Sequence, residues 1–121
     1  AVASRLKFLR IKVVHVRDGS ELFLHRNYPC DAFLLDTSVP GEFGGTGKPF
    51  DWGKISGMKP GKPWILAGGL NAGNVGEAIR IARPDGVDVA SGVESTPGEK
   101  DSNMVKSFIK NAKEAFVNVK K

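Results

Sequence analysis

Short apolar runs alternate along the chain with segments whose apolar residues recur at helical spacing. Four runs are rich in strand-forming residues: Ile11–Val16, Ala32–Leu35, Trp64–Ala67 and Val87–Ala90. Turn residues follow each run, and a segment that is able to form a helix follows the turn. The pattern therefore predicts four strands and four helices in strict alternation.

The two clearest helical segments lie in the second half of the chain. We expect one helix over Asn71–Ala82, with Asn71 as its N-cap, and another over Asp101–Val119, beginning at Asp101 or Ser102. In the second segment the apolar residues form one stripe and the lysines fall outside it. Residues 1–10 are interpreted as the end of a further helix that precedes the first strand.

Alternation of strands and helices specifies a parallel sheet with helices on its faces, so the predicted class is α/β. Two architectures fit the pattern, a part of a (β/α)8 barrel and an open flavodoxin-like sheet. A complete barrel needs about 250 residues, so the four βα units of this 121-residue chain amount to a (β/α)4 half-barrel. No linker divides the chain, and we expect residues 1–121 to form a single domain.

Composition agrees with one soluble globular domain, since 40% of the residues are hydrophobic and 26% are charged. The sequence has no apolar run of about 18 residues and no signal peptide, which predicts a cytoplasmic protein without membrane contact. The net charge of +5 comes from dispersed lysines and arginines, which is typical of solvated helix faces rather than of a nucleic-acid interface. A single cysteine and two histidines make a metal site unexpected.

Glycine-rich loops follow three of the predicted strands, at residues 36–48, 68–71 and 91–94. The last two loops together predict a phosphate cradle, because glycine lets backbone N–H groups approach an anion closely. The competing interpretation is that the glycines only permit tight turns. The first loop is not a nucleotide-binding P-loop, because Glu42 and Pro49 stand where that motif needs glycine and a hydroxyl residue.

Two aspartates are candidates for chemistry. Asp36 ends a predicted strand and would point into a barrel mouth, where burial favours the protonated form that a general acid needs. The alternative is an ordinary capping or turn aspartate. Asp88 lies inside the apolar run VDVA and therefore needs a partner or a ligand, for which a sugar hydroxyl is suitable.

Cys30 and the two histidines are given no catalytic role. Cys30 precedes Asp36 by six positions, on or just before the same predicted strand, so the two residues are expected about 20 Å apart, at opposite ends of the sheet. We therefore interpret Cys30 as structural. His15 and His25 have no recognisable partner in the sequence.

Three stretches resemble, in order and spacing, signature segments of the phosphoribosylanthranilate isomerase family: DAFLLDTSVPGEFGGTGKPFDW, WILAGGLNAGNV and RPDGVDVASGVESTPGEKD. The resemblance runs from about Ile11 to the C-terminal helix and implies strands five to eight of a (β/α)8 barrel. It also implies an Amadori rearrangement of N-(5′-phosphoribosyl)anthranilate to 1-(o-carboxyphenylamino)-1-deoxyribulose 5-phosphate, a step of tryptophan biosynthesis that uses no cofactor.

The resemblance further implies a role for each matching residue. Asp36 is the general acid, Asp88 holds a substrate hydroxyl, and Gly44 and Gly45 belong to a loop that closes over the substrate. The substrate phosphate is expected to contact four residues of the last two glycine-rich loops: Gly68, Gly69, Ser91 and Gly92.

The family's general base is a cysteine at the end of its first strand, which Cys30 does not replace, and we expect negligible isomerase activity from the isolated chain. A half-barrel also leaves its edge strands and inner face uncovered. We expect pairing of two copies, docking to an N-terminal half-barrel, or rearrangement to the open sheet. The alternative function is a catalytically silent phosphate-binding half-barrel or assembly fragment.

Overall fold

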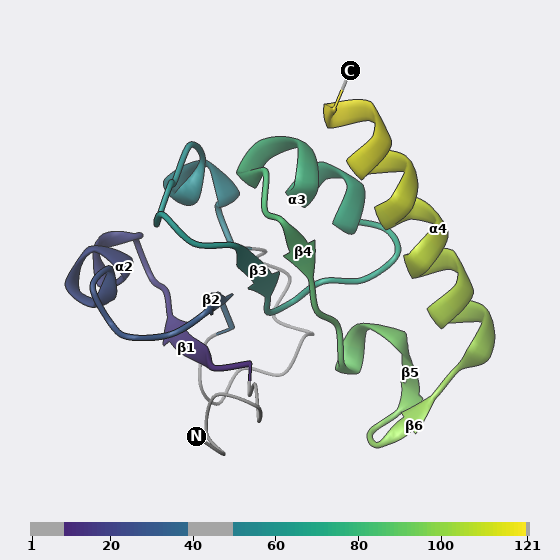
Figure 1. The fold of residues 1–121 in the computed structure, drawn as a ribbon. Coiled ribbons are helices and arrows are strands. Elements are labelled where there is room, and N and C mark those ends of the chain that lie inside the picture. Colours follow the sequence, from purple (N-terminus) through teal and green to yellow (C-terminus); the bar gives the residue numbers. More distant parts are fainter. Residues whose placement is uncertain (1–8, 39–49, 121) are drawn as a thin grey trace, which may run out of the picture.

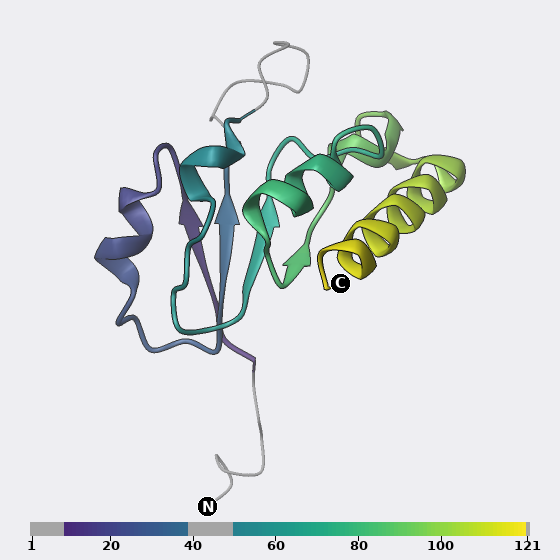
Figure 2. The ribbon, with the colours of Figure 1, turned by 90° about the horizontal axis from the view of Figure 1, so that it is seen from above.

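Four parallel strands form the centre of the protein in the computed structural model, which describes residues 9–38 and 50–120 (Figure 1). The strands are β1 (Ile11–His15), β2 (Ala32–Asp36), β3 (Trp64–Ala67) and β4 (Gly86–Val87), and they lie in the order β1-β2-β3-β4. Every neighbouring pair is parallel, so the carboxyl ends of all four strands face the same way (Figure 2). The loops after the strands therefore gather at one end of the sheet.

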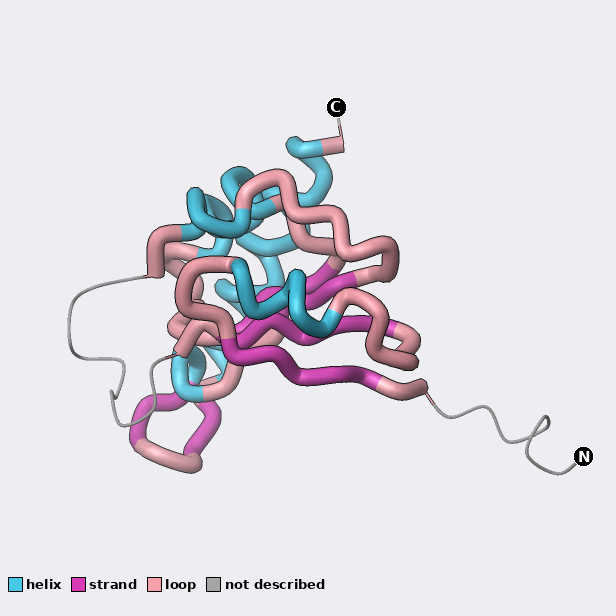
Figure 3. Tube along the Cα trace, turned by 90° about the vertical axis from the view of Figure 1, so that its left-hand side faces the viewer, coloured by secondary structure: helices cyan, strands magenta, loops and turns pink. Residues whose placement is uncertain are grey.

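Helices connect the strands along one side of the sheet, as Figure 1 shows. Helix α2 (Ser20–His25) follows β1, the short 3-10 helix η1 (Trp52–Ile55) precedes β3, and α3 (Val75–Ala82) joins β3 to β4. After β4 come the 3-10 turn η2 (Ser91–Val93), the hairpin of β5 (Glu94–Thr96) with β6 (Glu99–Lys100), and α4 (Ser102–Val119). Figure 3 shows this hairpin projecting away from the parallel sheet.

The two faces of the sheet differ in burial. The side chains on the helix-covered face are buried and form the core with α3 and α4; in the strands they are Val14, Phe33, Leu35, Trp64 and Leu66. On the other face Ile11 and Val13 of β1 are 41% and 46% exposed. Because side chains alternate along a strand, one set of apolar residues makes the core while the other set faces outward.

The α/β class with a parallel sheet is confirmed, and the open flavodoxin-like alternative is wrong for the described strands. A flavodoxin-like sheet reverses its strand order at a switch point and carries helices on both faces. Here the strands follow one another without reversal.

Several predicted boundaries need correction. The strand expected at Val87–Ala90 is observed only at Gly86–Val87, so Asp88 lies after the strand and not within it. The first strand ends at His15, one residue early, and the strand beginning at Ala32 extends to Asp36. The β5–β6 hairpin was not predicted.

The two clearest helices form close to where they were expected. Asp101 caps α4, because its carboxylate accepts hydrogen bonds from Asn103 N and Met104 N at 2.9 and 3.0 Å. Helix α3 begins at Val75, four residues later than predicted. Asn71 nevertheless holds the turn before it, since its side chain accepts from the backbone N–H groups of Gly73 and Asn74.

Candidate functional site

A row of polar residues crosses the carboxyl end of the sheet. The register pairs His15 at the end of β1 with Asp36 at the end of β2, and Asp36 with Ala67 at the end of β3. Asp88 follows β4 directly, and its N–H continues the ladder by donating to the Leu66 carbonyl at 2.9 Å. Residues in register on parallel strands point to the same face, so His15, Asp36 and Asp88 share the open face.

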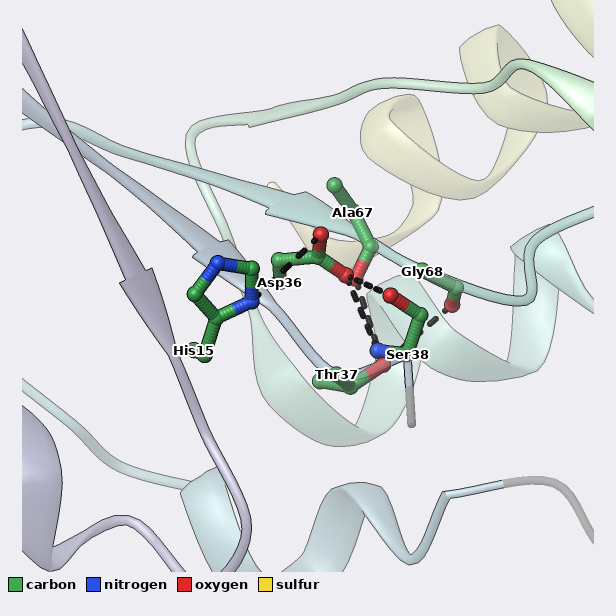
Figure 4. Close-up of polar contacts among 6 residues, drawn as sticks. All are labelled: His15, Asp36, Thr37, Ser38, Ala67 and Gly68. Atoms are coloured by element: carbon green, nitrogen blue, oxygen red, sulfur yellow. Dashed lines mark hydrogen bonds and ion pairs between the residues drawn. The ribbon is translucent and has the colours of Figure 1, made fainter. Parts of the chain in front are cut away.

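One carboxyl oxygen of Asp36 is hydrogen-bonded within its own loop, and the other is directed at the open face. Its Oδ1 accepts hydrogen bonds from Ser38 N at 2.9 Å and Ser38 Oγ at 2.6 Å (Figure 4). Its Oδ2 faces His15 Nδ1 at 3.8 Å, and the Asp36 side chain is 24% exposed. Asp36 therefore does form the turn that the competing interpretation foresaw, but one carboxyl oxygen remains directed at the open face.

Thr37 secures the next position of the same loop. It is the one buried polar residue in the described part of the chain. Its hydroxyl lies 3.2 Å from both the Ala67 and the Gly68 carbonyl oxygens, and its N–H donates to Ala67 O at 3.0 Å. These bonds fix the end of β2 to the end of β3 and thereby place Asp36 relative to the third loop.

Gly68 packs directly against the Asp36 turn. Its φ is +100°, a region that residues with a side chain rarely adopt. A Cβ at this position would lie 2.5 Å from Ser38 N and 2.8 Å from Asp36 Oδ1. Glycine is therefore required at position 68 for the loop after β3 to lie against the Asp36 turn.

The loops after β3 and β4 are in contact through Gly92. A Cβ on Gly92 would lie 1.8 Å from the Leu70 carbonyl oxygen and 3.2 Å from Asn71 Cα. Gly69 lies in the same loop as Leu70, and Ser91 directly precedes Gly92. The structure thus brings together the two loops that the sequence predicted would form one cradle.

Side-chain amides hold the loop after β3 in place. Asn74 Nδ2 donates to Gly69 O at 2.9 Å, and Asn71 N donates to Asn74 Oδ1 at 2.8 Å. From α4, Asn111 Nδ2 donates to Ala72 O at 2.7 Å. The loop is therefore tied both to its own helix and to the C-terminal helix.

The loop after β4 is anchored by a lysine and a glutamate. Lys100 Nζ donates to Ala90 O at 3.0 Å and also to the Glu94 carboxylate. The hydrogen bond from Lys100, together with one from Gly98 N, keeps the pKa of Glu94 below its usual range, despite a small opposing effect of burial. The hairpin thus fixes the segment that carries Ser91 and Gly92.

The remaining predicted residues fall in different places. Asp88 is exposed on the open face, so the buried carboxylate that the sequence suggested is not observed. Gly44 and Gly45 lie outside the described residues. Cys30 is buried before β2, at the opposite end of that strand from Asp36, as expected.

His15 is the residue that sequence reasoning missed. The statement that it has no recognisable partner is wrong, because Asp36 Oδ2 lies 3.8 Å from its Nδ1. The signal was available, since His15 and Asp36 each end one of two consecutive strands, and consecutive strands usually pair.

Two absences hold for residues 9–38 and 50–120. No group of three or more His, Cys, Asp or Glu side chains is arranged to hold a metal ion. None of the helices in these ranges is long and apolar enough to cross a membrane.

Comparison with known families identifies the chain. A family model described as N-(5′-phosphoribosyl)anthranilate isomerase matches residues 2–111. The chain belongs to this family. Members of the phosphoribosylanthranilate isomerase family are isomerases, and the three stretches that resembled it in the sequence lie within the matched range.

Relatives of the same name are similar over most of this chain. The N-(5′-phosphoribosyl)anthranilate isomerase of Desulforudis audaxviator is 52% identical over 108 residues, covering 88% of this chain and 52% of the relative. That of Magnetococcus marinus is 46% identical over 99 residues, covering 82% of this chain and 47% of the relative. The chain thus spans about half the length of the curated relatives it matches.

Solved structures give the same result. The phosphoribosylanthranilate isomerase of Thermotoga maritima has a TM-score of 0.78 and 46% identity, with 93% of this chain and 54% of that chain covered. An isomerase structure in complex with reduced 1-(o-carboxyphenylamino)-1-deoxyribulose 5-phosphate has a TM-score of 0.69 and 39% identity, covering 93% and 52%. The observed fold is therefore that of a part of the family's structure.

Proposed function

We propose that this chain is the C-terminal portion of a phosphoribosylanthranilate isomerase and provides the general acid and the phosphate site of its reaction. The observation that carries the proposal is the placement of Asp36. One carboxyl oxygen is anchored to Ser38, the other is directed at the open face, and glycine-rich loops lie beside it. The reaction is the Amadori rearrangement of N-(5′-phosphoribosyl)anthranilate in tryptophan biosynthesis.

The proposed architecture is a (β/α)4 half-barrel that comprises residues 1–121 as one domain. Its support is the uninterrupted strand order β1-β2-β3-β4 with the connecting helices along one side. β1 and β4 end the sheet, and the apolar face opposite the helices carries Ile11 and Val13. In a complete barrel these side chains would fill the interior.

Asp36 has the chemistry that the first step needs. A protonated carboxyl group donates its proton to the furanose ring oxygen, the ring C–O bond breaks, and the substrate becomes a Schiff base. A base then removes the C2′ proton to give an enolamine, which tautomerises to the ketone. Asp36 acts in the first of these steps, and its directed Oδ2 is the oxygen that would carry the proton.

The two joined loops supply the proposed phosphate site. The phosphate would contact backbone N–H groups of Gly68, Gly69, Ser91 and Gly92, and glycine leaves room for that approach. Asp88 shares the open face with Asp36 two strands away, at a spacing of about 10 Å, which suits a bound sugar hydroxyl. Gly44 and Gly45 are assigned to the closing loop by family resemblance alone.

The isolated chain lacks the general base. By resemblance the base is a cysteine on the family's first strand, and Cys30 lies buried at the wrong end of β2 to replace it. Loss of a general base lowers a rate by a factor on the order of 10² to 10⁴. We therefore propose negligible turnover by the chain alone and docking of an N-terminal half-barrel onto the open face.

Complementation tests this function. The chain is mixed with an N-terminal half of the Thermotoga maritima relative, and turnover of N-(5′-phosphoribosyl)anthranilate is followed. We expect background turnover from either half and a rate at least about 10²-fold higher from the mixture. Asp36→Asn should abolish the gain, while Asp31→Asn, at the other end of β2, should retain it.

Association without turnover, or full turnover with Asp36→Asn, would contradict the proposal. Binding of inorganic phosphate by the chain without any turnover in the mixture would favour the silent phosphate-binding alternative. If the chain instead forms a stable dimer that excludes the N-terminal half, a second copy occupies the open face.

A further inference from the structure

The imidazole of His15 faces the one carboxyl oxygen of Asp36 that its own loop leaves free. Ser38 N and Ser38 Oγ occupy Asp36 Oδ1, whereas His15 Nδ1 lies 3.8 Å from Oδ2. Figure 4 shows the imidazole and the Ser38 side chain on opposite sides of the carboxyl group. The separation is too long for a hydrogen bond but within the range of an ion pair.

The register of β1 and β2 places His15 next to Asp36. All five residue pairs between β1 and β2 are in register, from Ile11 with Ala32 to His15 with Asp36. The backbone continues the ladder beyond them, since Val16 N donates to Asp36 O at 2.9 Å. Strand pairing therefore places the His15 side chain beside Asp36, and this placement does not depend on the conformation of a loop.

We propose that His15, in its protonated form, is a positioning residue that stabilises the Asp36 carboxylate as that carboxylate forms. This inference rests on the proposed role of Asp36 as the acid. When Asp36 gives its proton to the ring oxygen, negative charge develops on its carboxyl group. A cation beside Oδ2 stabilises the charged product more than the neutral starting acid, which lowers the barrier to proton transfer.

Among residues 9–38 and 50–120, His15 is the one cationic side chain within ion-pair distance of Asp36. Asp88 lies on the same face beyond β3 and carries the wrong sign for such a role. Arg17 follows two residues after His15, beyond the end of β1, and no ion pair joins its side chain to Asp36. The described residues on β3 opposite Asp36 contribute only Ala67 and an uncharged loop.

The kinetic test uses the chain complemented with the N-terminal half. We expect His15→Gln to lower kcat about tenfold with KM changed less than about twofold, because the lost interaction forms only as charge develops. His15→Lys, which restores a cation, should recover most of kcat. His25→Gln on α2 is the matched control and should leave both constants unchanged.

Equal kcat for wild type and His15→Gln, or no recovery with His15→Lys, would overturn the inference. If Asp36→Asn abolishes turnover while the His15 variants leave kcat unchanged, the proposed function stands and this inference alone fails. If Asp36→Asn has no effect, the proposed function itself fails.

A second measurement needs no turnover. Carboxyl carbon NMR of the isolated chain at pH 6 should show the Asp36 signal displaced by His15→Gln and unmoved by His25→Gln. An Asp36 chemical shift that is the same in wild type and in both variants would contradict the pairing of His15 with Asp36, whatever the complementation experiment gives.

Discussion

A β-carbon on Gly92 would lie 1.8 Å from the Leu70 carbonyl oxygen, so the loops after β3 and β4 touch at a point that only glycine permits. Gly92→Ala must therefore separate the two loops that are proposed to hold phosphate. We expect at least a tenfold weaker affinity for inorganic phosphate, measured by calorimetry. Gly86→Ala on β4 is the control, since its Cβ would meet Ile65 Cγ1 at an ordinary 3.6 Å. Unchanged phosphate binding in Gly92→Ala would count against the two-loop cradle.

Gly68 and Gly69 are adjacent glycines with positive φ, but only Gly68 is crowded. Alanine at either position carries a backbone cost of about 1–2 kcal/mol. Gly68→Ala also drives its Cβ into Ser38 N and Asp36 Oδ1, which adds about 1–3 kcal/mol. A Cβ at position 69 would meet no atom within 4 Å. Urea unfolding should thus show a clearly larger loss of stability for Gly68→Ala than for Gly69→Ala. Equal losses would show that the close approach to Asp36 is not maintained in solution.

The hydroxyl of Thr37 is the buried link between β2 and β3. Thr37→Val keeps the shape but removes both contacts to the Ala67 and Gly68 carbonyl oxygens, so we expect a loss of about 1 kcal/mol in the free energy of unfolding. Thr96→Val is the control, because the Thr96 hydroxyl bonds Glu99 at the exposed hairpin. A loss from Thr96→Val as large as that from Thr37→Val would contradict the assigned role.

Asp101 caps the long C-terminal helix that covers α3. Asp101→Ala removes the acceptor for Asn103 N and Met104 N and should cost about 1 kcal/mol. Asp101→Ser supplies another capping oxygen and should recover most of that loss. Thermal unfolding followed by circular dichroism gives the comparison, and equal midpoints for the two variants would argue against a capping role.

The Glu21 carboxylate, which binds N–H groups of the loop after β1, makes the free energy of unfolding depend on pH. Burial raises the pKa of the Glu21 carboxyl. Hydrogen bonds from its own N–H and from the N–H groups of Arg17, Asp18 and Gly19 outweigh this effect, so the pKa lies below the usual range of a glutamate. A lowered folded-state pKa stabilises the fold above the unfolded value, and this contribution is lost as the pH falls through the folded pKa. The gap in unfolding midpoint between wild type and Glu21→Gln should therefore be larger at pH 7 than at pH 3. A gap of equal size at the two pH values would contradict this account.

The sequence predicted the strands best where apolar runs have sharp boundaries. Trp64–Ala67 was predicted to the residue, because Pro63 and Gly68 bracket it. β4 came out shorter than expected, because its pairing with β3 covers only Gly86 and Val87. The β5–β6 hairpin was missed although Pro97 and Gly98 form a recognised turn dipeptide.

For the site, the sequence identified the residue types but not their relationships. Asp36 and the glycine loops were found because they follow strands. The contact of His15 with Asp36 depends on the pairing register, and the crowding of Gly68 and Gly92 depends on how loops from different strands meet. Such long-range contacts leave no periodic signal in a single sequence.

Turnover of N-(5′-phosphoribosyl)anthranilate by the chain, alone and mixed in equal amounts with an N-terminal half-barrel, tests the central claim most directly. The half-barrel account predicts background activity for the chain alone, recovery in the mixture, and loss of that recovery with Asp36→Asn. Turnover by the chain alone, or a mixture that works equally well with Asp36→Asn, would contradict it.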